Sequence, residues 1–315
     1  MANFDVHPLA PGEGVPLFIA AGVIKEVGQL EPFFNIIDPL LAPVITLGSY
    51  TVTRWSGNAT IQDPIDYIHY PDRGMAGNAR NLPNEGIEGM RTMEQPIRRL
   101  SELGIKTIIS VTNLPHERPI DVIPGLVEAA AELNPTAIEI NLSCPNGRKA
   151  DGTLHAPLCN DADASGEVLF ESRLRVGQDV VMGAKDSPHV TSLDSMIDVR
   201  AIRGLVRVAA PLIDFLTGIN TIGNQPFPEI TANGGRGGMS GPVVKDIAKK
   251  HLQICKDLAP DLAYLSCGGV ETLNAAQEIK QRLAMGALLV GGAQQAYRLN
   301  PAKVMQQWAQ AYLFA

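Results

Sequence analysis

A cysteine flanked by carboxamide side chains is the part of this sequence best suited to catalysis. The segment Asn141-Leu-Ser-Cys-Pro-Asn146 places the thiol of Cys144 between two asparagines, directly after an apolar run. A free cysteine has a pKa of about 8.5, so modest tuning would make it a general base at working pH. The alternative is a buried structural cysteine in a turn, without a chemical role.

Lys185 ends another apolar run, in the segment Gly183-Ala-Lys-Asp-Ser-Pro-His189. A lysine that terminates a buried strand needs an anionic partner, and a cofactor phosphate or an anionic reduced flavin ring would supply one. The alternative is a surface lysine at the start of a loop.

Glycine pairs follow three later apolar runs, at Gly237-Gly238, Gly268-Gly269 and Gly291-Gly292. The first pair belongs to a glycine-rich loop, 234–241, whose last part we expect to open a helix and to offer backbone N–H groups to an anion. Together the pairs predict a cofactor that carries a phosphate.

Carboxamides also occur in Asn78-Ala-Arg-Asn-Leu-Pro-Asn84 and in Asn220-Thr-Ile-Gly-Asn224. The first segment offers donors and acceptors that suit a small planar polar ring, although alone it also fits an ordinary turn. The scattered histidines suggest no role.

Eight apolar runs alternate with helical patterns and must position these residues. The runs cover 16–22, 43–49, 106–112, 136–143, 179–185, 212–220, 262–269 and 287–293, and the helical segments cover 92–104, 119–133, 165–177, 195–209, 241–258 and 271–285. The runs lack polar alternation, which is typical of parallel strands buried on both faces. We therefore predict an α/β fold of the (β/α)₈ barrel type in one domain, 1–315; a Rossmann-type sheet is less suitable because no GxGxxG follows the first run.

Composition narrows the possible partners. The chain has 315 residues, a net charge of −7, four cysteines without a CxxC pair, and no leader-like N-terminus. An acidic protein does not suit nucleic acid or an anionic membrane. We expect a small-molecule substrate, no metal, no membrane span and a cytoplasmic location.

The motifs resemble those of the class 1 dihydroorotate dehydrogenases, FMN enzymes built on a (β/α)₈ barrel. The similarity runs in order along most of the chain, through Ala20-Ala-Gly22, Asn78…Leu82-Pro-Asn84, Asn141–Asn146, Gly183-Ala-Lys185, Asn220–Asn224, Gly237-Gly-Met-Ser-Gly241, Cys267-Gly-Gly269 and Val290-Gly-Gly292. The Asn-x-Ile-Gly-Asn motif at Asn220–Asn224 most resembles the motif of the homodimeric cytosolic branch of this family.

The resemblance implies oxidation of dihydroorotate to orotate in pyrimidine biosynthesis, in a homodimer. Cys144 would remove a proton from C5 of the ring, a hydride would pass from C6 to N5 of FMN, and Lys185 would stabilise the anionic reduced flavin near N1. Segment 145–164 would be a flap over the substrate. The implied substrate residues are Asn78, Arg80, Asn81, Leu82, Asn141, Asn146, Asn220 and Thr221; the implied cofactor residues are Ala20, Ala21, Gly22, Ser49, Asn141, Lys185, Gly237, Gly238, Gly268, Gly269, Gly291 and Gly292.

The sequence departs from the family at three places. The family has a lysine in its second strand, whereas no lysine occurs here between Lys25 and Lys106, so Arg80 is the candidate replacement. Asn81 stands where the family has glycine. A second thiol, Cys159, lies in a segment similar to the catalytic loop of dihydropyrimidine dehydrogenase, so either cysteine is a candidate base, with Cys144 preferred. Alternative functions are a paralogue acting on another cyclic or unsaturated substrate, and an inactive flavin-binding barrel.

Overall fold

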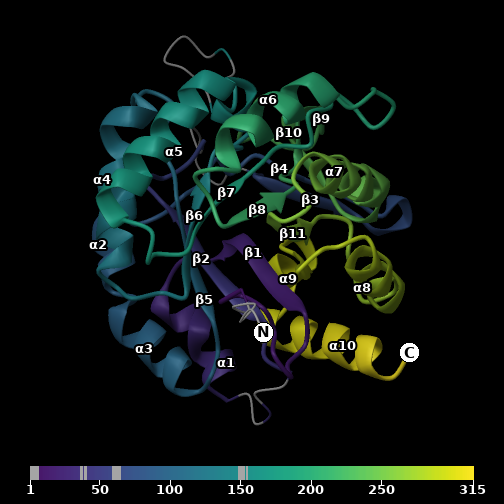
Figure 1. Cartoon of the computed structure of the whole chain (residues 1–315). Helices are drawn as coiled ribbons and strands as arrows, with labels where there is room; N and C mark the ends of the chain where they lie inside the picture. The colour runs from purple at the N-terminus through teal and green to yellow at the C-terminus, as the bar shows by residue number, and fades with distance from the viewer. Residues whose placement is uncertain (1–6, 36–37, 39–40, 59–64, 148–152, 154) are drawn as a thin grey trace.

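Eight parallel strands form the centre of the molecule. They are β1 (Leu17–Ile24), β2 (Val44–Tyr50), β5 (Thr107–Val111), β6 (Ala137–Asn141), β7 (Met182–Lys185), β8 (Phe215–Gly218), β11 (Ala263–Cys267) and β12 (Leu289–Gly292). This computed structural model describes residues 7–35, 38, 41–58, 65–147, 153 and 155–315. The strands close in the order β1-β12-β11-β8-β7-β6-β5-β2, which confirms the (β/α)₈ barrel (Figure 1).

Helices surround the barrel and cover the outward face of its strands (Figure 1). They are α1 (Glu31–Phe34), α2 (Gly86–Arg91), α3 (Glu94–Glu102), α4 (Pro119–Ala131), α5 (Ala162–Val176), α6 (Val199–Ala209), α7 (Lys245–Leu258), α8 (Ala275–Ala284), α9 (Gln294–Arg298) and α10 (Pro301–Leu313). All six predicted helical segments are present, whereas α1, α2, α9 and α10 lie outside them. No helix among the described residues is long and apolar enough to cross a bilayer.

The apolar core has one layer inside the barrel and one between the strands and the helices. Phe18, Phe215 and Leu265 belong to the inner layer and are fully buried. Trp308 of α10 belongs to the larger outer layer. Burial on both sides explains why the strand sequences lack polar alternation. The polar ends of these strands therefore emerge from a rigid core at one edge of the barrel.

A second sheet is the main feature that the sequence did not reveal. It pairs β3 (Tyr67–Tyr70), β4 (Met75–Asn78), β10 (Arg236–Ser240) and β9 (Ile222–Pro226), all antiparallel. Two segments far apart in the sequence meet here, since Gly238 of β10 lies opposite Asn78 of β4. The stretch between β2 and α2 thus contributes two of the four strands of this sheet, β3 and β4.

The prediction that 234–241 is a loop opening a helix is wrong for Gly237 and Gly238. Both residues lie within β10, and the helical region starts later, with a 3₁₀ turn at Pro242–Val244. A Cβ on Gly237 would come within 2.7 Å of the Asn78 carbonyl oxygen, and one on Gly238 would overlap the Thr221 hydroxyl. These glycines therefore permit close strand packing, in place of the expected anion-binding loop.

Candidate active site

A cavity lies at the carboxyl ends of the barrel strands, with β3, β4 and β10 contributing one wall. In barrels of this type, ligands and catalytic groups occupy that end. The cavity brings together most of the residues singled out from the sequence: Ala20, Ala21, Gly22, Ser49, Asn78, Arg80, Asn81, Leu82, Asn141, Cys144, Asn146, Lys185, Asn220, Thr221, Gly268, Gly269 and Gly292. Cys159, Gly237, Gly238 and Gly291 do not line it.

Cys144 faces this cavity from the loop that follows β6. Its Sγ atom donates a hydrogen bond to Oδ1 of Asn81 over 3.6 Å. Burial raises the pKa of the Cys144 thiol, while the backbone N–H of Asn146 and the charges of Lys25 and Lys185 act in the opposite direction. The two lysines therefore favour the thiolate, the form that can accept a proton.

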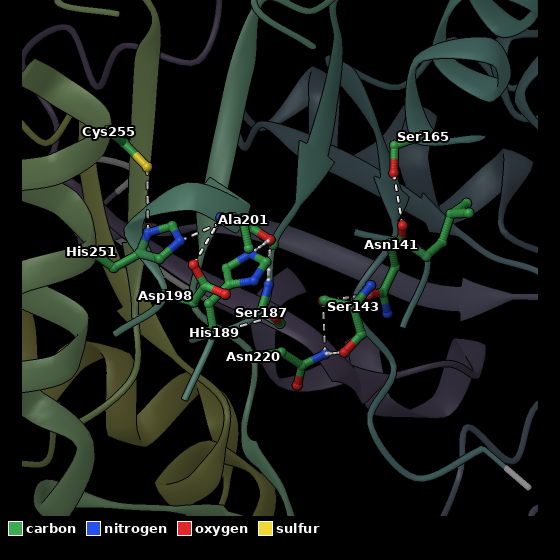
Figure 2. A network of polar contacts seen from close by, with 12 residues as sticks. Asn141, Ser143, Ser165, Ser187, His189, Asp198, Ala201, Asn220, His251 and Cys255 are labelled. Atoms are coloured by element: carbon green, nitrogen blue, oxygen red, sulfur yellow. Dashed lines mark hydrogen bonds and ion pairs between the residues drawn. The ribbon is translucent and has the colours of Figure 1, made fainter. Parts of the chain in front are cut away.

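Carboxamides from three strand ends surround the thiol. Nδ2 of Asn146 donates to Oδ1 of Asn78 over 3.1 Å, which joins the β6 loop to β4. Nδ2 of Asn220, after β8, donates to the carbonyl and the hydroxyl of Ser143, each over 3.1 Å (Figure 2). Buried Oδ1 of Asn146 has no hydrogen-bond partner among the described residues. Buried polar atoms are ordinarily paired, so this oxygen is available to a ligand donor.

Asn141 is held from both sides at the end of β6. Its Nδ2 donates to Oγ of Ser49 over 2.9 Å, and its Oδ1 accepts from Oγ of Ser143 over 2.9 Å. Ser49 in turn shares a hydrogen bond with Ser110, which donates to buried Glu139. This chain fixes the orientation of the Asn141 carboxamide before any ligand arrives.

The backbone of the loop after β4 explains why asparagine can stand where the family has glycine. Asn81 has a φ of +52°, in the left-handed region. Asparagine tolerates this region better than other non-glycine residues, so the substitution preserves the loop. The loop is held by Asn58, whose Oδ1 accepts from Nδ2 of Asn81 over 2.9 Å, and by Trp55, whose Nε1 donates to the Asn81 carbonyl over 2.9 Å.

Lys25 is a site residue that the sequence analysis missed. It directly follows β1, lines the cavity and donates from Nζ to the carbonyl oxygen of Pro83 over 2.7 Å. Burial, with a contribution from the neighbouring charge of Arg80, lowers the pKa of Lys25 to about 8. The signal that the sequence offered for Lys25 is its position directly after an apolar run that forms a barrel strand.

Arg80 also lines the cavity, but its charge is already balanced. Its Nε atom lies 3.1 Å from Oδ2 of Asp66, and its guanidinium carbon lies 4.5 Å from the ring centre of Tyr297. Arg80 is therefore turned toward a carboxylate and an aromatic ring. We expected Arg80 to replace the lysine that the second strand lacks. The structure gives little support to this expectation, because Lys25 supplies the additional positive charge in the cavity.

Lys185 ends β7 as expected and is only 4% exposed. No carboxylate lies within 4 Å of its Nζ among the residues that the structure describes. A buried ammonium without a counter-ion is costly, so an anionic ligand beside it would be stabilised.

The histidines, which are scattered in the sequence, include two that meet at Asp186, the residue after Lys185. Nε2 of His189 and Nε2 of His251 lie 2.8 Å and 3.0 Å from the two carboxylate oxygens of Asp186, and Nδ1 of His251 lies 2.6 Å from the Tyr264 hydroxyl. Burial would raise the pKa of Asp186, but the hydrogen bonds from both histidines outweigh it and hold that pKa well below its ordinary value. This network fixes the residue next to Lys185.

Cys159 belongs to this network rather than to the cavity. It is 1% exposed, and its Sγ lies within 4.8 Å of ligand atoms of Asp186 and His189, a grouping that could in principle hold a metal ion. Both Asp186 oxygens already accept hydrogen bonds from histidines. Burial raises the pKa of Cys159 well above its usual value, and the charge of Asp186 adds to the effect. Cys159 is therefore poorly suited to accept a proton from a ligand.

The expected flap, 145–164, is described only in part, because 148–152 and 154 lie outside the described residues. Of the remainder, the backbone N–H of His155 donates to the Gly147 carbonyl, and that of Cys159 donates to the Leu142 carbonyl. The end of the segment is thus tied to the strand end that carries Cys144. Whether it acts as a flap stays a prediction.

The opposite end of the cavity suits a flat ligand with a phosphate. Gly22 has a φ of +107°, and a Cβ there would meet no atom within 4 Å, so the space beside it is open. Gly268 and Gly269 (φ +101° and +80°) and Gly292 line the loops after β11 and β12, the seventh and eighth barrel strands, which commonly bind phosphate. Nearby Oε1 of Gln294 is buried and unpartnered among the described residues. Gly291 instead packs where a Cβ would overlap the Phe18 carbonyl.

Comparison with known proteins decides the family. The model of the dihydroorotate dehydrogenase family matches residues 14–306. The chain belongs to the dihydroorotate dehydrogenase family. As a member of this family, it is an oxidoreductase.

Similar proteins include three named dihydroorotate dehydrogenase B (NAD(+)), catalytic subunit. That of Lachnoclostridium phytofermentans is 28% identical over 84% of this chain and 79% of its own length. That of Staphylococcus carnosus is 24% identical, over 86% of this chain and 80% of its own length. That of Geobacillus kaustophilus is 28% identical, over 78% and 72%. The names describe a catalytic subunit, so the homodimer expected from the sequence stays a prediction.

Proposed function

We propose that this protein binds FMN and oxidises dihydroorotate to orotate, with Cys144 as the base. The observation that carries the proposal is a thiol in a cavity lined by five asparagine carboxamides, with two lysines that favour its ionised form. Asn78, Asn146 and Asn220 present donors and acceptors from three separate strand ends, an arrangement that suits a planar ring with alternating carbonyl and N–H groups. A scaffold without catalysis would have no need for a thiol there.

Each residue has a defined task in this proposal. Cys144 removes the proton from C5 of the dihydropyrimidine, and the carboxamides hold the ring so that this carbon faces the sulfur. Bound FMN supplies the acceptor for the hydride that leaves C6. Lys185 contributes a positive charge at the cavity floor, where it favours an anionic group. The glycines of the loops after β11 and β12 leave room for the phosphate of the cofactor.

Between the two candidate bases, the geometry favours Cys144. Its side chain lines the cavity, whereas Cys159 does not line it and lies beside Asp186. A base must come within hydrogen-bond reach of the proton that it removes. Cys159 could do so only after the segment that carries it left the Leu142 carbonyl.

An anaerobic titration of the purified protein with dihydroorotate tests the proposal directly. Loss of the visible flavin absorption would demonstrate a bound flavin, a competent base and the proposed substrate in one measurement. A flavin that stays oxidised with dihydroorotate but is bleached by another cyclic substrate would identify a paralogue with different chemistry. Absence of flavin after reconstitution with FMN would contradict the cofactor assignment.

Assembly and domain organisation are part of the proposal. We propose a homodimer in which 1–315 forms one folding unit, acting on a small molecule in the cytoplasm. Light scattering on the purified protein would give twice the 33.7 kDa chain mass if the dimer is correct. A single cooperative unfolding transition would support one domain, and two separated transitions would contradict it.

A further inference from the structure

We propose that Lys25 binds the acid group of the ring substrate and so makes this cavity selective for ring acids over neutral rings. The inference rests on the proposed function, because it assigns one part of the substrate to one residue of the same site. It concerns a residue at the end of β1, which no sequence motif singled out.

The ammonium group of Lys25 has N–H donors that make no hydrogen bond to the described residues. Its Nζ makes one hydrogen bond, to the carbonyl oxygen of Pro83, and no carboxylate lies within 4 Å among the described residues. An ammonium has three N–H donors. Lys25 also lines the cavity, so the remaining donors can reach a ligand. A carboxylate is the partner that such a site favours, because charge-assisted hydrogen bonds are about twice as strong as neutral ones.

The hydrogen bond to Pro83 also fixes the position of the Lys25 charge in the cavity. It anchors Lys25 to the loop that carries Asn81 and Leu82, both of which line the same cavity. In the same loop, Oδ1 of Asn81 accepts a hydrogen bond from the Cys144 thiol over 3.6 Å, so this loop links Lys25 to the base. An acid group held by Lys25 would therefore lie on the side of the ring that faces the base.

The other cations of the cavity are less suited to this task. Arg80 is paired with Asp66 at 3.1 Å and stacked on Tyr297. Lys185 lies deeper, at the end of β7 opposite Asn141, and is expected to serve the cofactor. The charged groups that act on Lys25 are Arg80, Cys144 and Glu26, of which Glu26 is exposed and lies next to it in the chain. Of the two cavity lysines that lack a carboxylate partner among the described residues, Lys25 is therefore the one that is not assigned to the cofactor.

The test compares an acid ligand with a neutral one in three holoproteins. Binding of orotate and of uracil, the same ring without its carboxylate, would be followed through changes in the flavin spectrum of the wild type, Lys25→Met and Arg80→Met. We expect Lys25→Met to weaken orotate binding by about ten- to hundredfold and to change uracil binding less than about threefold, as expected for the loss of one charge-assisted contact. Arg80→Met should weaken orotate binding less than Lys25→Met does.

Lys25→Arg provides a second variant that retains the charge. It should recover at least part of the lost orotate affinity, and flavin content measured in every variant reports whether the fold is intact. Equal loss of orotate and uracil binding in Lys25→Met, with flavin retained, would mean a structural role and would overturn the inference. So would full orotate affinity in Lys25→Met. If the wild type binds flavin but neither orotate nor uracil, the proposed function fails instead, which separates the two failures.

Discussion

The thiol of Cys144 and the carboxamide of Asn81 face each other across 3.6 Å, with the sulfur as donor and Oδ1 as acceptor. The amide orientation is fixed because Nδ2 of Asn81 is committed to Oδ1 of Asn58, 2.9 Å away. An acceptor opposite an S–H group stabilises the protonated thiol. This contact therefore acts with burial, and against the nearby lysines, in setting how readily Cys144 ionises.

Replacement of Cys144 by serine should abolish most of the flavin reduction by dihydroorotate. A hydroxyl ionises far less readily than a thiol, and loss of a general base typically costs about 10²- to 10⁴-fold in rate. Stopped-flow absorbance would measure the reduction rate. Cys159→Ser is the matched control, and we expect it to retain a rate within about tenfold of the wild type, because that thiol lies outside the cavity. The reverse pattern would assign the base to Cys159.

The pH dependence of flavin reduction should follow the ionisation of Cys144. Burial raises the pKa of this thiol, so at neutral pH most of it is protonated and cannot accept a proton. The rate should therefore increase as the pH rises toward the alkaline range. A rate of reduction that is flat between about pH 6 and 9 would be inconsistent with a buried thiol as the base.

Lys185→Met should slow flavin reduction by about 100-fold, because it removes a buried charge where negative charge develops. The lysine is 4% exposed and lacks a carboxylate partner among the described residues, so its removal leaves no acidic group unpaired. The same stopped-flow assay gives the rate. Lys249→Met, at a lysine that pairs with Asp246 and Glu278 away from the cavity, should leave the rate unchanged. Similar rates in both variants would refute the role of Lys185.

Asp186→Asn should reduce the free energy of unfolding by about 3 kcal/mol at pH 7, because it removes a buried charge that two histidines contact. The folded pKa of Asp186 is depressed, so its stabilisation is present above about pH 4 and is lost as the pH falls further. Urea unfolding at pH 7 and pH 3 should thus show a smaller difference at pH 3. Asp198→Asn, at an exposed helix N-cap, should change little, because both residues cap well.

Gly269→Ala should destabilise the protein and impair FMN retention. Its φ is +80°, and a Cβ would lie 2.5 Å from Cα of Lys245, so the loop after β11 would have to move. Gly104→Ala is the control, because its φ is +75° but its Cβ would meet nothing within 4 Å. We expect the control to lose about 1 kcal/mol and no flavin, whereas Gly269→Ala should lose more stability and part of its flavin. Equal effects would show that strain alone matters.

The barrel was predictable because its signal is local. Each strand is a short apolar run between helical patterns. A strand that is buried on both faces needs apolar residues at successive positions, so the run is visible in the sequence. The second sheet was not predictable in this way. The residues of β10, Arg236–Ser240, include two glycines that resemble a loop, and they form a strand only because β4 lies beside them. Contacts between distant segments leave no periodic pattern in either one.

The candidate site was predictable where a residue follows a strand end in a compact motif, as for Asn141, Cys144 and Lys185. It was not predictable for Lys25, whose place in the cavity depends on the direction in which the chain leaves β1. The role of His251 was hidden for a similar reason, because it lies on α7 and reaches Asp186 from another segment. The predictable residues belong to compact motifs at strand ends, whereas Lys25 and His251 reach their partners only when distant segments come together in the fold.

Among the residues that the structure describes, the barrel and the antiparallel sheet share no strand, although both line the cavity. The barrel strands and the loops after them carry the thiol, the lysines and the glycines, while β3, β4 and β10 contribute one wall. The two parts can therefore change at different rates during evolution. Exchanging both wall segments between relatives would alter the shape of the ring pocket on that side and leave the proton-removing and cofactor-holding residues in place.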